Sequence, residues 1–185
     1  MSELREGQVK IPNARIGYPK LFVPEAIKGM ADSRPRYGCA VYLSKDDKKT
    51  KAKIDIEIKR IVEAKLKGVM PKSKDLCIKD GDGEDGDENT VGHWIISANR
   101  QESQGRPTVI DRDRSPLAQQ DAKIYAGCRC DFLVGFFVPK GWAKIACGLE
   151  IVQFRGDDEP FGAGRPDVSV MEDLSEEDEE AGFAV

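Results

Sequence analysis

Apolar and polar residues alternate along much of the second half of the chain, a pattern that predicts β-strands. Over residues 124–138 one face would be apolar or cysteine throughout, while the opposite face mixes aromatic, charged and glycine residues. Residues 142–155 repeat this alternation, and Pro139-Lys140-Gly141 between the two segments is typical of a tight hairpin turn. The pattern predicts two long antiparallel strands that each bury one face.

Further strands are predicted in the rest of the chain, where β-branched and aromatic residues lie between clusters of Gly, Pro and Asp. These strands cover residues 7–23, 36–43, 92–100 and 107–112. One helix is predicted within residues 44–68, because apolar residues recur at helical spacing, Ser44 would cap its start and Gly68 would end it. Strands with a single helix, and no βαβ rhythm, indicate a mainly β fold, either a small antiparallel barrel or a sandwich.

The faces opposite the predicted cores carry aromatic rings next to Arg and Lys, together with small residues. This combination suits single-stranded nucleic acid, because bases stack on the rings for about 1–3 kcal/mol each and cations neutralise the phosphates. A second interpretation, an apolar layer beneath the helix or in an interface, applies above all to Phe137 and Phe154. The predicted DNA contacts are Tyr125, Arg129, Trp142, Lys144, Phe137, Phe154, Tyr42, Arg36, Trp94 and Arg112.

Charge divides the chain into two parts. The 29 basic and 33 acidic residues give a net charge of −4, but seven of the acidic residues and no Lys or Arg lie in residues 171–185. Without those seven, 26 acidic residues face 29 basic ones, so residues 1–170 have a net charge of about +3. The composition therefore predicts one domain over residues 1–170 and a disordered acidic tail over residues 171–185.

Motifs of enzymes and metal sites are not found in the sequence. Five cysteines without a CxxC pair, and His93 as the single histidine, do not supply a zinc site. The acidic loop 80–88 fails the calcium pattern, because its sixth and twelfth positions hold Asp85 and Val91. No GxSxG or Walker motif occurs. We therefore expect a non-enzymatic protein without catalytic residues, cofactor or metal.

Two other classes of function stay open on the residues alone. A metal-dependent DNA-processing enzyme would use the acidic loop 80–88, and an OB-type protein-interaction module would use the aromatic face for docking. No apolar run reaches the roughly 20 residues that a membrane span needs, and the N-terminus has no apolar signal core. We expect a protein of the host cell cytoplasm that does not contact membranes.

A succession of short blocks resembles a family of bacteriophage single-stranded DNA-binding proteins that was long catalogued as a domain of unknown function. The resemblance extends over residues 9–164. Its blocks are YPKLF (18–22), RY (36–37), LSKDD (43–47), IKDGD (78–82), PTVID (107–111), IYAGC (124–128), IACGL (145–149), VQF (152–154) and EPFG (159–162).

The resemblance implies an OB-fold, a five-stranded antiparallel Greek-key barrel related to the helix-destabilising replication protein of T-odd phages. It also implies sequence-independent binding of single-stranded DNA in phage replication and recombination, and contacts of the acidic tail with replication proteins such as DNA polymerase. The tail residues expected to make these contacts are Glu176, Glu177, Asp178, Glu179, Glu180 and Phe183. In this chain Ala184 and Val185 follow Phe183, so the aromatic residue is not terminal. A homodimer is left open.

Overall fold

The computed structural model describes residues 2–162 and 168–172. Seven strands and one α-helix are described: β1 (Gln8–Glu25), β2 (Arg36–Ser44), α1 (Lys48–Lys65), β3 (Ile78–Asp80), β4 (His93–Gln101), β5 (Thr108–Ile110), β6 (Arg129–Phe137) and β7 (Ala146–Gly156). Short 3-10 helices lie at Ser73–Asp75, Glu102–Gln104, Gln119–Asp121 and Val168–Val170. The predicted strands and the helix are confirmed, while the short β3 was not predicted.

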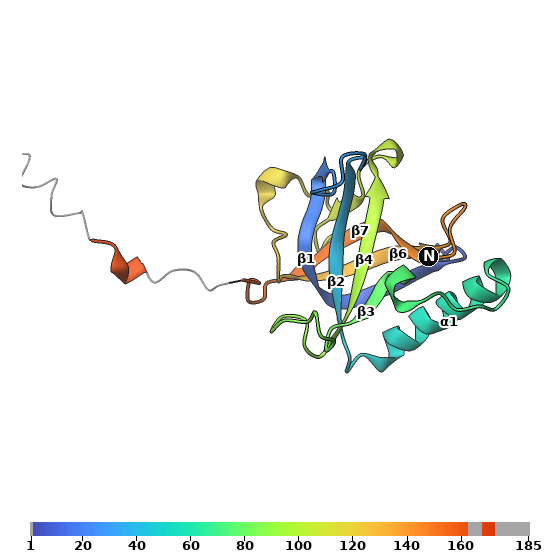
Figure 1. Cartoon of the computed structure of the whole chain (residues 1–185). Helices are drawn as coiled ribbons and strands as arrows, with labels where there is room; N and C mark the ends of the chain where they lie inside the picture. The colour runs from blue at the N-terminus through green and yellow to red at the C-terminus, as the bar shows by residue number, and fades with distance from the viewer. Residues whose placement is uncertain (1, 163–167, 173–185) are drawn as a thin grey trace, which may run out of the picture.

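Five strands close into a barrel in the order β1–β2–β4–β7–β6 and back to β1. Four of these pairings are antiparallel, and the closing seam between β4 and β7 is parallel, with Asn99 opposite Gly148. In Figure 1, β1, β2 and β4 stand side by side, and β6 and β7 run across behind them. This arrangement confirms the predicted OB-type barrel.

The first strand bends so that it serves both halves of the barrel. Its beginning pairs with β6 and its later part pairs with β2. The register shifts after Ile11 and again after Gly17, and Pro12 and Pro19 lie at these irregularities, where a strand tolerates a missing N–H donor. The strand predicted over residues 7–23 is therefore one long bent strand, Gln8–Glu25.

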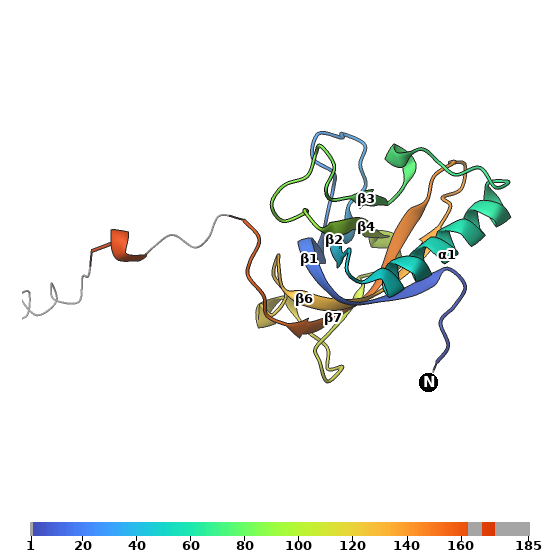
Figure 2. The ribbon, with the colours of Figure 1, turned by 90° about the horizontal axis from the view of Figure 1, so that it is seen from below.

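The helix packs on the barrel through one apolar side. Ile54, Ile58 and Val62 are buried and contact the core formed with β1 and β6. Figure 2 shows α1 lying across the lower side of the barrel. The helix begins after Asp47, whose carboxylate accepts a 3.0 Å bond from the Thr50 N–H, so the prediction of Ser44 as the cap is wrong because Ser44 is the last residue of β2. No helix in residues 2–162 or 168–172 is long and apolar enough to cross a membrane.

The boundary predicted at residues 170/171 stays a prediction. The six tail residues with predicted partner contacts lie outside the described residues: Glu176, Glu177, Asp178, Glu179, Glu180 and Phe183.

Candidate nucleic-acid interface

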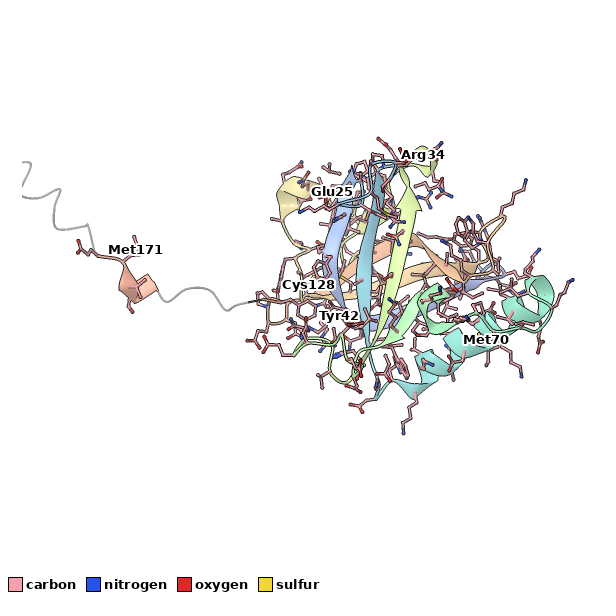
Figure 3. All side chains as sticks on the ribbon, in the orientation of Figure 1. Glu25, Arg34, Tyr42, Met70, Cys128 and Met171 are labelled. Carbon is pink, nitrogen blue, oxygen red and sulfur yellow. The ribbon has the colours of Figure 1, made fainter. Side chains whose placement is uncertain are left out.

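The outer face of β1, β2 and β4 has small residues at its centre. On β2 and β4, Cys39, Val41 and Ala98 face the core, so the residues between them face outward. This outer face comprises Arg15, Gly17 and Lys20 on β1, Arg36, Gly38, Ala40 and Tyr42 on β2, and Ser97, Asn99 and Gln101 on β4. Ser97 is exposed and Ala40 is half-buried, whereas Gly17 and Gly38 are buried beneath the side chains of Tyr42 and Asn99. Cationic residues lie around these small residues. In Figure 3, Glu25 and Arg34 mark one end of this face and Tyr42 lies toward the other.

A groove of about 670 Å³ continues from the outer face across the seam between β4 and β7. The groove is lined by five basic residues, Arg5, Arg36, Lys74, Arg100 and Lys144, and by three acidic ones, Glu6, Asp75 and Glu150. Two of these acids have partners, because Glu6 forms an ion pair with Arg60 of α1 and Glu150 accepts a hydrogen bond from Gln8. The cations are therefore in excess, as binding of a phosphate backbone requires.

The groove combines a low floor with aromatic rings at its rim. Gly148 and its partner Gly135 have no side chains, so the floor is low at this pair, and Asn99 and Glu150 supply the neighbouring side chains of the lining. Phe137 at the end of β6 is 47% exposed, and Trp142 in the hairpin is 65% exposed. Nζ of Lys144 lies 4.9 Å from the centre of the Trp142 ring. Exposed rings beside cations form a surface on which bases stack while phosphates are neutralised.

A second cluster of the predicted residues lies at the Tyr42 end of the outer face. It is covered by residues 158–162, a segment that follows β7 and that we call the strap. The Asp158 carboxylate lies 2.7 Å from Nε of Arg129 and 3.5 Å from Nε of Arg15. The Phe161 ring lies 4.7 Å from the Tyr42 ring, and the Arg15 guanidinium lies 4.3 Å from the Phe161 ring. The strap therefore holds both cations and the aromatic ring of this cluster.

Tyr125 anchors the start of the strap. Its hydroxyl lies 3.0 Å from Oδ1 of Asp157 and accepts a 3.1 Å hydrogen bond from the N–H of Asp158. Burial raises the pKa of the Tyr125 hydroxyl, and the Asp157 carboxylate raises it further. Partial burial alone would raise the pKa of Asp158, but the Glu159 N–H and the Arg129 guanidinium outweigh it, so this pKa lies below its usual value. Asp158 is thus held as a carboxylate against its two arginines.

Three predicted contacts join neither cluster. Phe154 is only 8% exposed and belongs to the core, so its predicted outward placement is wrong. The Trp94 ring packs against the core and is covered by Lys45 and Lys51, whose Nζ atoms lie 4.7 and 4.4 Å from it. Arg112 lies in the exposed loop after β5, where its carbonyl accepts a hydrogen bond from Gln153. The structure thus brings together Arg36, Phe137, Trp142 and Lys144 at the groove, and Tyr42, Tyr125 and Arg129 at the strap.

Several residues of the two clusters were missed in the sequence. Asn99 lies within the predicted strand 92–100, and pairing that strand with 36–43 would have found it. Arg5 and Lys74 lie in irregular segments without a pattern that marks them. Arg15 and Phe161 become neighbours only because the chain after β7 returns to β1.

The acidic loop 80–88 is partly neutralised by a lysine. Nζ of Lys45 lies 2.5 Å from a carboxylate oxygen of Asp80 and 2.5 Å from one of Asp82. Hydrogen bonds from this ammonium lower the pKa of both carboxyls. Within residues 2–162 and 168–172, no group of three or more His, Cys, Asp or Glu is placed to hold a metal ion.

Comparisons with known proteins agree in fold and in family. The model of the family described as Enterobacter phage Enc34, ssDNA-binding protein, matches residues 7–184. The putative protein p50 of Acyrthosiphon pisum secondary endosymbiont phage 1 is 30% identical over 182 residues, which are 94% of this chain and 97% of that protein.

Two solved structures extend the comparison. The single-stranded DNA-binding protein of bacteriophage Enc34, solved in complex with ssDNA, is similar with a TM-score of 0.72 and 27% identity, over 88% of this chain and 97% of that one. The single-stranded DNA-binding protein gp2.5 of bacteriophage T7 has a TM-score of 0.57 and 15% identity, over 91% of this chain and 96% of that one. The T7 protein supports the shared fold alone.

Proposed function

The chain belongs to the Enc34 family of phage single-stranded DNA-binding proteins, and from this premise we propose that it binds single-stranded DNA in the groove and on the adjoining outer face. The observation that carries the proposal is the groove itself. It combines five cations, two glycines in its lining and two exposed aromatic side chains, Phe137 in the lining and Trp142 beside the lining residue Lys144.

Each part of the groove has a separate task in this proposal. Lys144, Arg36 and Lys74 neutralise phosphates, and their contribution falls as salt rises because binding releases counterions. Phe137 and Trp142 stack on bases, which are free in a single strand but paired inside a duplex. Stacking does not distinguish one base from another, so the interaction is independent of sequence.

The proposed role extends to phage DNA replication and recombination in the host cytoplasm, without an enzymatic activity. We infer that the acidic tail, residues 171–185, competes with DNA for the basic surface and contacts replication proteins such as a polymerase when DNA displaces it. The charge pattern supports this, because a tethered polyanion has a high effective concentration near the groove. Removing the tail should tighten binding of oligo-dT, whereas an unchanged affinity would leave it no competing role.

The groove is tested by fluorescence anisotropy with a labelled 30-residue oligo-dT. Trp142→Ala should weaken binding by about 1–3 kcal/mol, since one stacking ring is lost. Lys144→Ala should weaken binding and reduce the slope of log K against log salt by about 0.7, the value for one phosphate of a single strand.

Lys140→Ala is the matched control, because Lys140 is exposed in the same hairpin but does not line the groove. Equal losses for Lys140→Ala and Lys144→Ala would mean that the groove is misplaced. Incubating the labelled strand with the protein and Mg²⁺ or Mn²⁺ should leave it intact, and cleavage would favour the metal-dependent enzyme instead.

A further inference from the structure

We infer that Arg15, Arg129 and Tyr42 form a second nucleotide-binding subsite, and that Asp158 and Phe161 of the strap occupy it while DNA is absent. This inference rests on the proposed function, because the ligand is one phosphate and one base of the same single strand. The strap would then be a competitor built into the folded domain, separate from the acidic tail.

The charged half of the subsite is a pair of arginines around one carboxylate. Arg15 and Arg129 both approach Oδ2 of Asp158, at 3.5 and 2.7 Å. Two guanidinium groups on one carboxylate leave one positive charge in excess. Guanidinium donors match phosphate as well as carboxylate oxygens, so a phosphate can take the place of Asp158.

The aromatic half is the ring of Tyr42. This ring packs over Gly17, where a Cβ would lie 2.9 Å from it, so the ring lies close to the backbone of β1. Phe161 covers the ring at 4.7 Å with a tilt of 49°, and Tyr42 is consequently 5% exposed. Without Phe161 the Tyr42 ring would face solvent, and the slot between this ring and the Arg15 guanidinium would accept a flat base.

Tyr18 adds an exposed ring at the edge of this slot. It is 73% exposed and has a φ of +45°, a left-handed conformation that is rare for a bulky residue. Tyr18 directly follows Gly17, the residue over which the Tyr42 ring packs. Strain of this kind is concentrated at ligand sites, where it fixes a side chain in place.

The subsite lies on the same surface as the groove. Cross-strand pairs lead from Asn99 and Gly38 past Ala40 to Tyr42. Tyr42 lies four residues after Gly38, a distance of about 13 Å along the strand at 3.3 Å per residue. A strand in the groove can therefore continue over the small residues of the outer face to the subsite.

When the strap closes the subsite in most molecules, the apparent affinity for DNA is the affinity of the open form multiplied by the fraction of molecules that are open. Opening requires loss of the Asp158 ion pairs and of the 3.0 Å hydrogen bond from the Phe161 N–H to the Ala126 carbonyl. DNA that reaches both the groove and the subsite makes more phosphate contacts than DNA confined to the groove.

Removing the charge of Asp158 distinguishes competition between the strap and DNA from a general change in the charge of the protein. Asp158→Asn should tighten binding of the 30-nucleotide oligo-dT about 3- to 10-fold, and should steepen the slope of log K against log salt by about 0.7 as one phosphate meets the freed arginines. Asp157→Asn is the matched control, since it removes the same charge from a residue that bonds to Tyr125 and forms no ion pair with an arginine in the described part of the chain. Its affinity should stay within about 2-fold of the wild type. Equal effects of the two variants, or no effect of Asp158→Asn, would overturn the inference.

Hydrogen exchange on the unaltered protein gives a second test that does not depend on the folding of a variant. Adding oligo-dT should accelerate exchange at the Phe161 amide while the amides of β2 and β4 are protected. Slower or unchanged exchange at Phe161 would overturn the subsite.

If Lys144→Ala weakens binding but the strap responds neither to mutation nor to DNA, the groove stands and this inference fails. If oligo-dT does not bind at all, the proposed function itself fails.

Discussion

Gly148 has no side chain at the point where β4 and β7 close the barrel. A Cβ at this position would lie 3.6 Å from the Gly135 carbonyl oxygen and 3.8 Å from the Phe137 ring, both ordinary contacts. The fold therefore has room for a side chain here, and a larger one would extend into the groove. The value of this glycine lies in the space that it leaves for a ligand.

Gly148→Val should leave the protein folded but weaken its binding to DNA. A β-branched residue suits a strand, so the free energy of unfolding should stay the same or rise by up to about 1 kcal/mol. Affinity for oligo-dT should fall because the valine side chain fills the floor of the groove. Gly156→Val, where a Cβ meets nothing within 4 Å, is the control for both thermal unfolding and anisotropy. Unaltered affinity in Gly148→Val would contradict a role of the floor.

The five cysteines are free thiols with unequal access to solvent. Burial raises the pKa of Cys39 to about 12, and it also raises the pKa of Cys147, which interacts with Cys77. The interaction with the Cys147 thiol is the main cause that lowers the pKa of Cys77, the partly exposed thiol.

A thiol reagent such as DTNB at pH 8 should therefore modify the native protein at Cys77 alone. All five cysteines should react once guanidinium unfolds the chain. Mass spectrometry of the labelled peptides would identify the site. Rapid labelling of Cys39 or Cys147 in the native protein would show that the core opens far more readily than its packing indicates.

Among the elements, β7 shows where reading a sequence by alternation fails. Its pairing with β6 changes register between Leu133–Ile151 and Val134–Leu149, which adds one residue to β7. The bulge reverses the faces beyond it, so Val152 and Phe154 point inward although simple alternation places them outward. The buried face predicted for β6 was correct because the alternation there is uninterrupted. Nothing in the local sequence marks the extra residue.

Phe154 and Trp142 should consequently respond to mutation in opposite ways. Phe154→Ala removes a ring from the core and should lower the free energy of unfolding by about 3–5 kcal/mol, with little change in DNA affinity under conditions where the variant is folded. Trp142→Ala removes an exposed ring and should weaken DNA binding with little loss of stability. Urea titrations and anisotropy on both variants check the contrast. A specific loss of affinity in Phe154→Ala would restore the role first predicted for it.

On the scale of the whole molecule, the sequence predicted the barrel better than the binding surface. Alternation, the hairpin turn and the helix pattern are local signals, and together they predicted a mainly β barrel or sandwich. The resemblance to the phage family then favoured the OB-type barrel. The groove unites Arg5, Arg36, Lys74 and Lys144 from four separate segments, which only closure of the barrel brings together. Cations in irregular segments have no periodic pattern, so their convergence was out of reach.

Stability of the whole domain should decrease in acid. Hydrogen bonds from Lys45 lower the pKa of Asp80 and Asp82, and one from Lys123 lowers that of Asp111. A carboxyl with a lowered pKa stabilises the folded state above its ordinary pKa of about 4, and this contribution is lost as pH falls through the lower value of the folded state. Thermal unfolding temperatures should therefore drop progressively below about pH 4.

Lys45→Met tests the source of this pH dependence. It removes the partner of two carboxylates, so the decrease in unfolding temperature between pH 5 and pH 2 should be smaller than in the wild type. Lys49→Met removes the same charge from an exposed position on α1 and should follow the wild-type curve. Identical curves for all three proteins would mean that the Lys45 pairs do not contribute.

The way in which β1 is paired has a consequence for synthesis of the chain. Gln8 lies opposite Gly135, and β6 must in turn pair with β7, so the first strand acquires its last neighbours only when nearly the whole domain has left the ribosome. Until then β1, β2 and β4 expose the apolar residues of their inner face and one unpaired edge. Contacts between distant parts of a chain form slowly, and an exposed edge invites pairing with other chains. A truncated product that ends before β6 is therefore expected to aggregate rather than persist as a smaller soluble sheet.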